Sequence, residues 1–382
     1  MGQTRFFGWK VVGAAFVVAA FGWGVGFYGP PVFLHALEAG RGWPVWVASA
    51  AVTGHFLVGA FAVTRLARLH ARFGVVAVTR AGAVSVALGL LGWGFAAEPW
   101  QLFLATLFSG AGWAATGAAA LNAFVAPWFA RRRPVALGAA YNGASLGGMV
   151  FSPLWVALIG WLGFGLAGAL VGGVVVATLW WLSGRYLGRR PAEMGLAPDG
   201  DAPDAPRPAP RPVAALGGNP WRERRFATLA IGNALGLFAQ IGVLAHLVAL
   251  LAPVLGAQGA GFAAGLATAC ALAGRSVTGW LLRPAVQRRV ALALNGLAQA
   301  VGVAVLALAD APWLALAGVA LFGLGLGNAT SLAPLVAQQD FAEADVPRVV
   351  GLLVASGQAA YAFAPLAMGL LRGVDAWARS GW

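Results

Sequence analysis

Charged side chains are scarce in this chain of 382 residues, and their scarcity limits what the protein can be. Asp, Glu, Lys and Arg together make up 10% of the residues, whereas about 25% is usual for soluble domains. Hydrophobic residues account for 60%, and the mean hydropathy is +0.78. A compact soluble fold cannot hide this much apolar surface. The composition therefore excludes a cytosolic enzyme and a disordered protein, and it indicates an all-α polytopic membrane protein.

Cysteine pairs, enzyme motifs and intramembrane carboxylates are missing as well. Cys270 is the single cysteine, so an intrachain disulfide framework is excluded. No HExxH motif, Cys/His cluster or Walker A sequence occurs, so we expect no enzyme activity, cofactor or metal site. None of the twelve Asp and Glu residues lies in the middle of an apolar segment, which argues against a proton relay built on carboxylates.

Long apolar segments are what the sequence has in abundance. A membrane-spanning helix needs roughly 20 apolar residues, and eleven segments meet this requirement. The first is too long for a signal peptide and is interpreted as a retained helix. The eleven predicted spans are Val11–Leu34, Trp46–Leu66, Val75–Ala96, Leu102–Phe124, Pro134–Leu158, Phe164–Leu182, Ala227–Leu250, Gly261–Leu282, Val290–Leu308, Leu314–Val336 and Val349–Leu371.

The net charge of +13 is distributed unevenly between the loops. With the N-terminus in the cytoplasm, 21 of the 25 basic residues fall on cytoplasmic loops, and only Arg41, Arg372 and Arg379 fall outside. This asymmetry is the positive-inside pattern of membrane proteins, so the basic charge does not indicate nucleic-acid binding. An odd number of spans would place the C-terminus on the periplasmic side.

A polar, Pro-rich stretch divides the chain into two related parts. Residues 188–220 are expected to form a flexible cytoplasmic linker between an N-terminal six-helix bundle, 1–187, and a C-terminal bundle, 221–382, with five visible helices. Trp9 and Trp221 are 212 residues apart, and the segments Phe129–Pro153 and Phe341–Pro365 repeat at the same offset. Parallel repeats of this kind are typical of the major facilitator fold, two pseudo-symmetric bundles around a midplane site. A twelfth helix, which would complete the second bundle, is not evident.

Several stretches resemble the monocarboxylate porter family of the major facilitator superfamily and its oxalate–formate antiporter-like bacterial members. They are WFARRRPVALGAAYNGASLGG at Trp128–Gly148, RPAEMGLAPDG at Arg190–Gly200 and FFGWKVV at Phe6–Val12. The resemblance implies transport of small organic anions by alternating access, with proton symport as the family's usual coupling. One departure is Ala71 in the motif LHARFG, where the superfamily usually has an acid.

Arg275 is the leading candidate for substrate binding. It lies inside the predicted span Gly261–Leu282, flanked by apolar and small residues, where an uncompensated charge is costly and faces a cavity or a partner. A guanidinium binds a carboxylate with two parallel hydrogen bonds, and the family's carboxylate-binding arginine lies in the same predicted helix. The alternative is a structural link to a backbone carbonyl. His246 and, less strongly, His55 are candidates for proton coupling because imidazole titrates near neutral pH; both could instead be packing residues.

Neutral polar side chains inside the apolar segments complete the candidate substrate site. Most such groups in membrane proteins form hydrogen bonds between helices, so each of these residues has either a packing role or a role in substrate contact. The resemblance to oxalate carriers places a second cation near Gln358, and a neutral residue there favours a substrate with one carboxylate. The candidates that join Arg275 and His246 are Asn122, Tyr28, Tyr141, Tyr361, Gln358 and Asn328.

Together these features predict a monomeric secondary transporter of monocarboxylates in a bacterial inner membrane, with the lipid bilayer and protons as its other partners. An alternative within transport is export of a neutral or amphipathic solute, with Arg275 structural. A non-transporting membrane sensor is the alternative from another class, although no appended signalling domain is evident.

Overall fold

The structure is a computed structural model that describes residues 6–41, 43, 45–201, 216–281, 287–364 and 367. These residues form helices and connecting turns, and no strand occurs among them. The α-helices are α1 (Gly8–Gly26), α2 (Gly29–Arg41), α3 (Val45–Phe95), α4 (Pro99–Thr116), α5 (Ala118–Val125), α6 (Arg133–Leu182), α7 (Arg224–Leu281), α8 (Arg288–Ala307), α9 (Pro312–Leu326), α10 (Ala329–Asp340) and α11 (Val346–Tyr361).

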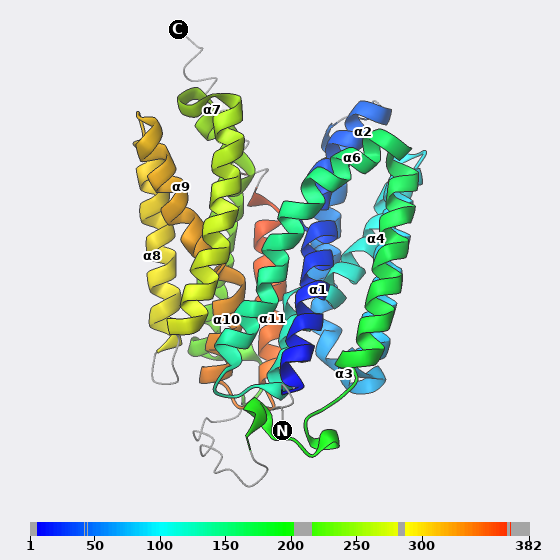
Figure 1. Cartoon of the computed structure of the whole chain (residues 1–382), viewed down its shortest axis with the longest axis vertical. Coiled ribbons are helices and arrows are strands. Elements are labelled where there is room, and N and C mark those ends of the chain that lie inside the picture. The colour runs from blue at the N-terminus through cyan, green and yellow to red at the C-terminus, as the bar shows by residue number, and fades with distance from the viewer. Residues whose placement is uncertain are drawn as a thin grey trace, which may run out of the picture.

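Three of these helices, α3, α6 and α7, each contain two passes of the chain across the molecule. Each reverses at one glycine with positive φ: Gly74 at 79°, Gly163 at 75° and Gly256 at 71°. Side chains with a Cβ rarely adopt this backbone region, so glycine is the residue that permits the reversal. Figure 1 shows α6 rising along one bundle and returning at its edge.

Three other passes are each made of two shorter helices. The breaks lie at Phe27–Tyr28 between α1 and α2, at Gly117 between α4 and α5, and at Gly327–Asn328 between α9 and α10. From the sequence we expected each of these three passes to be one continuous helix, and the structure corrects this expectation. Counted by pass, the described residues still give the expected eleven. Seven helical stretches among them are long and apolar enough to cross a membrane.

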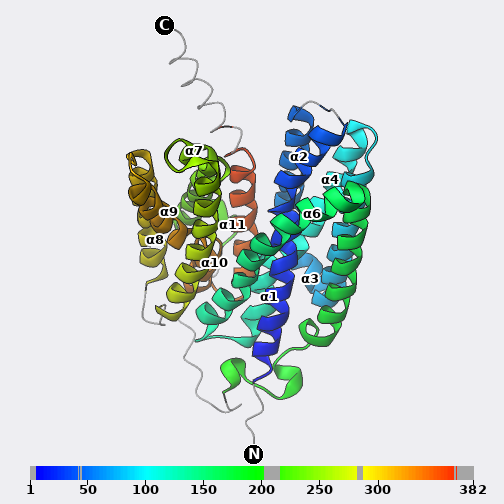
Figure 2. The ribbon, with the colours of Figure 1, turned by 45° about the horizontal axis from the view of Figure 1, so that its top comes forward.

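The passes form two bundles, α1–α6 and α7–α11 (Figures 1 and 2). The bundles meet where α11 packs against α3 and α6 packs against α7. Within a bundle, glycines allow close helix packing: a Cβ added at Gly143 would overlap the Phe16 carbonyl, and one at Gly274 would overlap the Leu324 carbonyl. Such small-residue contacts are a main source of cohesion between membrane helices.

The polar segment after α6 is partly folded, so the expectation of a flexible linker is wrong for residues 188–201. Two 3₁₀ turns, Ala192–Met194 and Pro198–Gly200, lie at the same end of the molecule as the start of α1 (Figure 1). We call this end the linker face. Asp199 holds the segment there by accepting hydrogen bonds from the backbone N–H groups of residues 130–132, at 2.8–3.2 Å. The expected position of the C-terminus concerns residues outside the described ones.

Candidate functional site

Arg275 lies in the second pass of α7, at the boundary between the two bundles. Its side chain is buried, with 5% exposed. Nε donates a hydrogen bond to the Gly327 carbonyl at 2.7 Å, within its own bundle. Nη1 donates across the boundary to the Tyr141 carbonyl at 2.6 Å and to Ser145 Oγ at 3.3 Å. None of these three bonds uses Nη2, and all three acceptors are neutral.

The break between α9 and α10 explains why the Gly327 carbonyl is available. In a continuous helix this carbonyl would accept from the Ser331 N–H, but that N–H bonds the Asn328 carbonyl instead, at 3.1 Å. A Cβ at Gly327 would overlap the Ala271 carbonyl, so glycine brings α7 against the break. The Gly327 carbonyl is therefore free of the helical N–H that would usually bond it, and it accepts from Arg275 instead.

Asn122 and Tyr141 form a buried hydrogen-bond network next to Arg275. Asn122 Nδ2 donates to the Tyr141 hydroxyl at 2.8 Å and to the Ala118 carbonyl at 2.9 Å, and the Tyr141 hydroxyl donates to the same carbonyl at 3.0 Å. Gln338 of α10 donates to Asn122 Oδ1 at 3.2 Å and extends the network into the second bundle. Sequence reasoning missed Gln338 and Ser145, since nothing in the sequence distinguishes them from other polar helix residues.

Tyr28 lies in the break between α1 and α2 and completes this first group. Its ring faces α6, where a Cβ added at Gly148 would lie 2.5 Å from a ring carbon. Tyr28 and Arg275 lie against the same part of α6, Tyr28 at Gly148 and Arg275 at Ser145. The structure thus brings together four candidates, Arg275, Tyr141, Asn122 and Tyr28, at the junction of the bundles.

Gln358 and Tyr361 form a second group on α11. The Tyr361 ring packs edge-on against Phe27 and Phe56, with centroid distances of 6.1 and 5.3 Å. Gln358 is 3% exposed, and its buried Nε2 has no hydrogen-bond partner. Because an unpaired buried amide is costly, this donor is a candidate for a contact that another conformation or a substrate supplies.

Asn328 and His55 occupy separate networks. Asn328 Nδ2 donates to Thr278 Oγ1, Asn295 Oδ1 and the Leu324 carbonyl at 2.9–3.3 Å, all within the second bundle. His55 Nε2 is 2.9 Å from the Gly26 carbonyl and its Nδ1 is 2.8 Å from Ser109 Oγ, both within the first bundle.

The sequence explains the partner of His55. Position 30 is proline, which has no N–H to donate to the Gly26 carbonyl four residues earlier. His55 supplies the missing donor. Both ring nitrogens are therefore occupied in the neutral imidazole. His246 lies on α7, but its side chain is outside the described residues.

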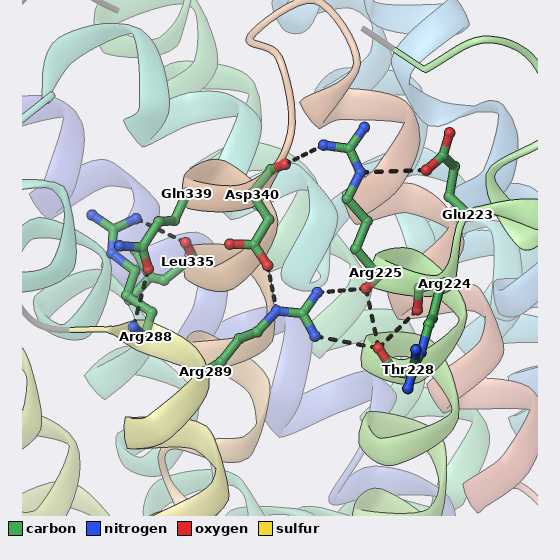
Figure 3. A network of polar contacts seen from close by, with 9 residues as sticks. All are labelled: Glu223, Arg224, Arg225, Thr228, Arg288, Arg289, Leu335, Gln339 and Asp340. Atoms are coloured by element: carbon green, nitrogen blue, oxygen red, sulfur yellow. Dashed lines mark hydrogen bonds and ion pairs between the residues drawn. The ribbon is translucent and has the colours of Figure 1, made fainter. Parts of the chain in front are cut away.

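The linker face is held by two further networks of polar contacts. In the second bundle, Arg289 bonds the Asp340 carboxylate at the end of α10 and the Arg225 carbonyl at the start of α7 (Figure 3). Arg288 donates to the Leu335 carbonyl at 2.8 Å. In the first bundle, the Asp199 contacts hold the loop before α6. Each network joins loops of one bundle.

Hydrogen bonds between the bundles lie at Arg275 and toward the linker face. Besides the bonds of Arg275, Asn142 Nδ2 donates to Ser276 Oγ at 3.1 Å, and Gln338 bonds Asn122. Figures 1 and 2 show the ribbons of the two bundles together at the linker face and diverging toward the opposite end. The hydrogen bonds between the bundles thus lie at Arg275 and on its linker side, while the Tyr361 ring contacts Phe27 and Phe56 of the first bundle at the other end of α11.

Two helical bundles with broken helices and a buried arginine between them define a multi-pass membrane transporter rather than an enzyme. The chain belongs to the Major Facilitator Superfamily, whose sequence profile matches residues 7–365. Alternating access, in which the two bundles rock about a central site, is the general mechanism of this superfamily.

The relatives confirm the resemblance to monocarboxylate transporters. Monocarboxylate transporter 11 of Homo sapiens is 27% identical over 381 residues, which cover 96% of this chain and 70% of that protein. Monocarboxylate transporter 13 of Bos taurus is 33% identical over 157 residues, covering 40% of this chain and 35% of that protein. The solved proton:xylose symporter XylE, bound to 6-bromo-6-deoxy-D-glucose, superposes with a TM-score of 0.70 at 12% identity, covering 97% of this chain and 90% of that one. This structural likeness concerns the fold.

Proposed function

We propose that the protein transports a small organic anion with a single carboxylate, bound by Arg275 between the bundles. The observation that carries the proposal is the uncompensated charge of this residue. Arg275 is buried, its three hydrogen-bond acceptors are neutral, and no carboxylate among the described residues forms an ion pair with it. An anionic ligand would neutralise that charge.

The geometry suggests how the substrate would engage the guanidinium. The Gly327 bond holds Nε on the second bundle, while Nη1 bonds two acceptors of the first bundle. A carboxylate that accepts from Nη1 and Nη2 would replace the Tyr141 and Ser145 contacts and leave the Gly327 contact in place. Substrate binding would then loosen a link between the bundles. The polar groups of Asn122, Tyr28, Gln358 and Tyr361 lie around the same junction.

Proton coupling is proposed through His246 or through the carboxylate of the substrate itself. Intramembrane Asp and Glu residues, which commonly carry protons in transporters, are missing from the apolar segments. The monocarboxylate transporters among the relatives support a substrate with one carboxylate. The neutral side chain of Gln358 agrees with that number.

We further propose that the protein is a monomer in a bacterial inner membrane, with the linker face in the cytoplasm. The basic loop residues support this orientation: Arg131, Arg288 and Arg289 all lie near the linker face, as positive-inside topology requires.

A binding assay with the purified protein tests the proposal. Mono- and dicarboxylates would be screened by thermal shift, and the dissociation constant of the best ligand measured for Arg275→Lys and for the exposed control Arg72→Lys. Loss of a bidentate charged hydrogen bond corresponds to roughly 10- to 100-fold weaker binding. Unchanged affinity in Arg275→Lys would overturn the assignment of Arg275 to the carboxylate.

The second candidate function is transport of a neutral or amphipathic solute with Arg275 as a structural link. The bonds from Arg275 to carbonyls of both bundles support it. In that case Arg275→Lys would lower the melting temperature but leave ligand affinity unchanged, and neutral solutes would produce the thermal shifts.

A further inference from the structure

A groove lined by two arginines lies between α3 and the end of α6, away from the junction of the bundles. It has a volume of about 630 Å³ and is open to the surface. Arg80 and Arg185 provide its charge, and Trp180 and Trp181 lie beside them. Val176 and Ala177 give it an apolar side further along α6.

Arg80 is held in a position that leaves part of its guanidinium unsatisfied. Its Cζ lies 4.6 Å from the centroid of the Trp180 ring, and Nη2 reaches the Trp180 carbonyl only at 3.4 Å. Nε is buried and has no hydrogen-bond partner. Glycine at position 184 permits this approach, because an added Cβ would lie 2.6 Å from Nη2.

The charge of the two arginines is not balanced by a carboxylate in the part of the chain that the structure describes. Among the described residues, no carboxylate lies within ion-pair distance of Arg80 or Arg185. Arg185 belongs to a π-helical turn, Ser183–Leu187, that ends α6. Such turns are uncommon and frequently occur at functional sites. This turn places Arg185 at the groove beside Arg80.

The groove lies close to the expected level of the lipid headgroups on the linker side of the bilayer. Arg80 is six residues past Gly74, the reversal point of α3, and therefore about 9 Å into the pass at 1.5 Å per residue. The Trp180 and Trp181 side chains are 47% and 61% exposed, as expected for tryptophans at the level of lipid headgroups. The groove thus combines a cationic end near the linker face with an apolar side between two membrane-spanning helices.

We propose that this groove binds an anionic phospholipid, with its phosphate on Arg80 and Arg185 and an acyl chain along Val176 and Ala177. The phosphate oxygens would supply the acceptors that Arg80 Nε lacks. Basic pockets between membrane helices bind anionic headgroups in this way. The apolar side favours a lipid over a free phosphate, because a soluble anion would leave that surface unused. The proposal is independent of the transported substrate.

Native mass spectrometry of the purified protein in neutral detergent tests the proposal. The probes are phosphatidylglycerol and phosphatidylcholine in equal amounts, and sn-glycerol 3-phosphate as a soluble competitor. We expect preferential retention of phosphatidylglycerol, weakened about five-fold by Arg185→Gln, the effect of one arginine near an anionic headgroup. The double variant Arg80→Gln/Arg185→Gln should weaken it further.

The matched control is Arg68→Gln/Arg72→Gln, which removes the same charge from exposed positions outside the groove. This control should retain phosphatidylglycerol like the unmodified protein. Equal retention of both lipids by the unmodified protein would overturn the proposal, as would an unchanged Arg185→Gln variant. Displacement by glycerol 3-phosphate would assign the groove to a soluble phosphate instead. An equal loss in the control would show that general surface charge is responsible.

Discussion

Substitution of Asp199 by Asn should release the folded part of the linker from the first bundle. The Asp199 side chain is buried and accepts hydrogen bonds from the backbone N–H groups of Ala130, Arg131 and Arg132. Its φ is +64°, a conformation that Asn tolerates well. The substitution therefore removes the charge and one acceptor without adding backbone strain.

The magnitude follows from the change in hydrogen-bond type. A hydrogen bond to a charged group contributes about 1.5–3 kcal/mol and a neutral one about 0.5–1.5 kcal/mol, so each retained bond weakens by about 1 kcal/mol. The single amide oxygen of Asn can retain two of the three bonds, and the third is lost because the amide nitrogen cannot accept; the donors are only partly buried, which reduces the total cost. We expect docking of the linker to weaken by about 2 kcal/mol, which corresponds to roughly 30-fold more frequent local opening.

Hydrogen–deuterium exchange measured by mass spectrometry provides the assay. Exchange in peptides covering residues 126–133 and 188–201 should accelerate roughly 30-fold, while α8 should be unaffected. The control is Asp201→Asn, whose carboxylate pairs with the half-exposed Arg131 side chain. Such surface pairs contribute under about 1 kcal/mol, so the control should change little. Identical exchange in Asp199→Asn and the unmodified protein would refute the capping role of Asp199.

Three further predictions concern the membrane-embedded part. Gly274→Ala should lower the melting temperature in detergent, because the added Cβ would push α7 away from the Leu324 carbonyl at an overpacking cost of about 1–3 kcal/mol. The control is Gly232→Ala on the same helix, where a Cβ meets no atom within 4 Å, and it should leave the melting temperature unchanged. His55→Leu should lower the melting temperature, because it leaves the Gly26 carbonyl without its side-chain donor and removes one of the two hydrogen-bond partners of Ser109 Oγ. It should leave the shape of the pH profile of transport unchanged. His246→Gln should flatten that profile if this imidazole carries the proton; a wild-type profile would return His246 to a packing role.

The number and order of the passes could be predicted from sequence because apolar length is a direct requirement of the bilayer. The two bundles followed from the repeat. The helix breaks were not predicted, although the sequence carries a signal for the first: Pro30 and Pro31 remove the N–H partners of two carbonyls. The folded linker was missed because its composition suggested disorder, whereas one acidic side chain at Asp199 organises it through backbone donors.

Arg275 could be singled out from sequence, but its partners could not. Two of its three acceptors are backbone carbonyls, and every residue has a carbonyl, so no residue type marks them. The grouping of Asn122 and Tyr141 beside it also depends on how the bundles pack. Sequence could name these polar residues as candidates because burial of polar groups in a membrane is costly, and only the fold could decide which of them meet.

A common arrangement connects the helix breaks to the buried polar side chains. At the first break, the Gly26 carbonyl is bonded by His55 from the same bundle. At the third break, the Gly327 carbonyl is bonded by Arg275, also from the same bundle. Only Arg275 additionally reaches acceptors of the other bundle, Tyr141 and Ser145.

This difference has a consequence for rocking of the bundles. A bond within one rigid bundle persists when the bundles separate, whereas a bond between them must break. The Gly327 contact would therefore keep the guanidinium in the second bundle throughout the cycle, while Nη1 loses its protein acceptors when the linker face opens. In the proposed function, the substrate carboxylate is the acceptor that would compensate for that loss, and binding and opening would then be coupled at Arg275.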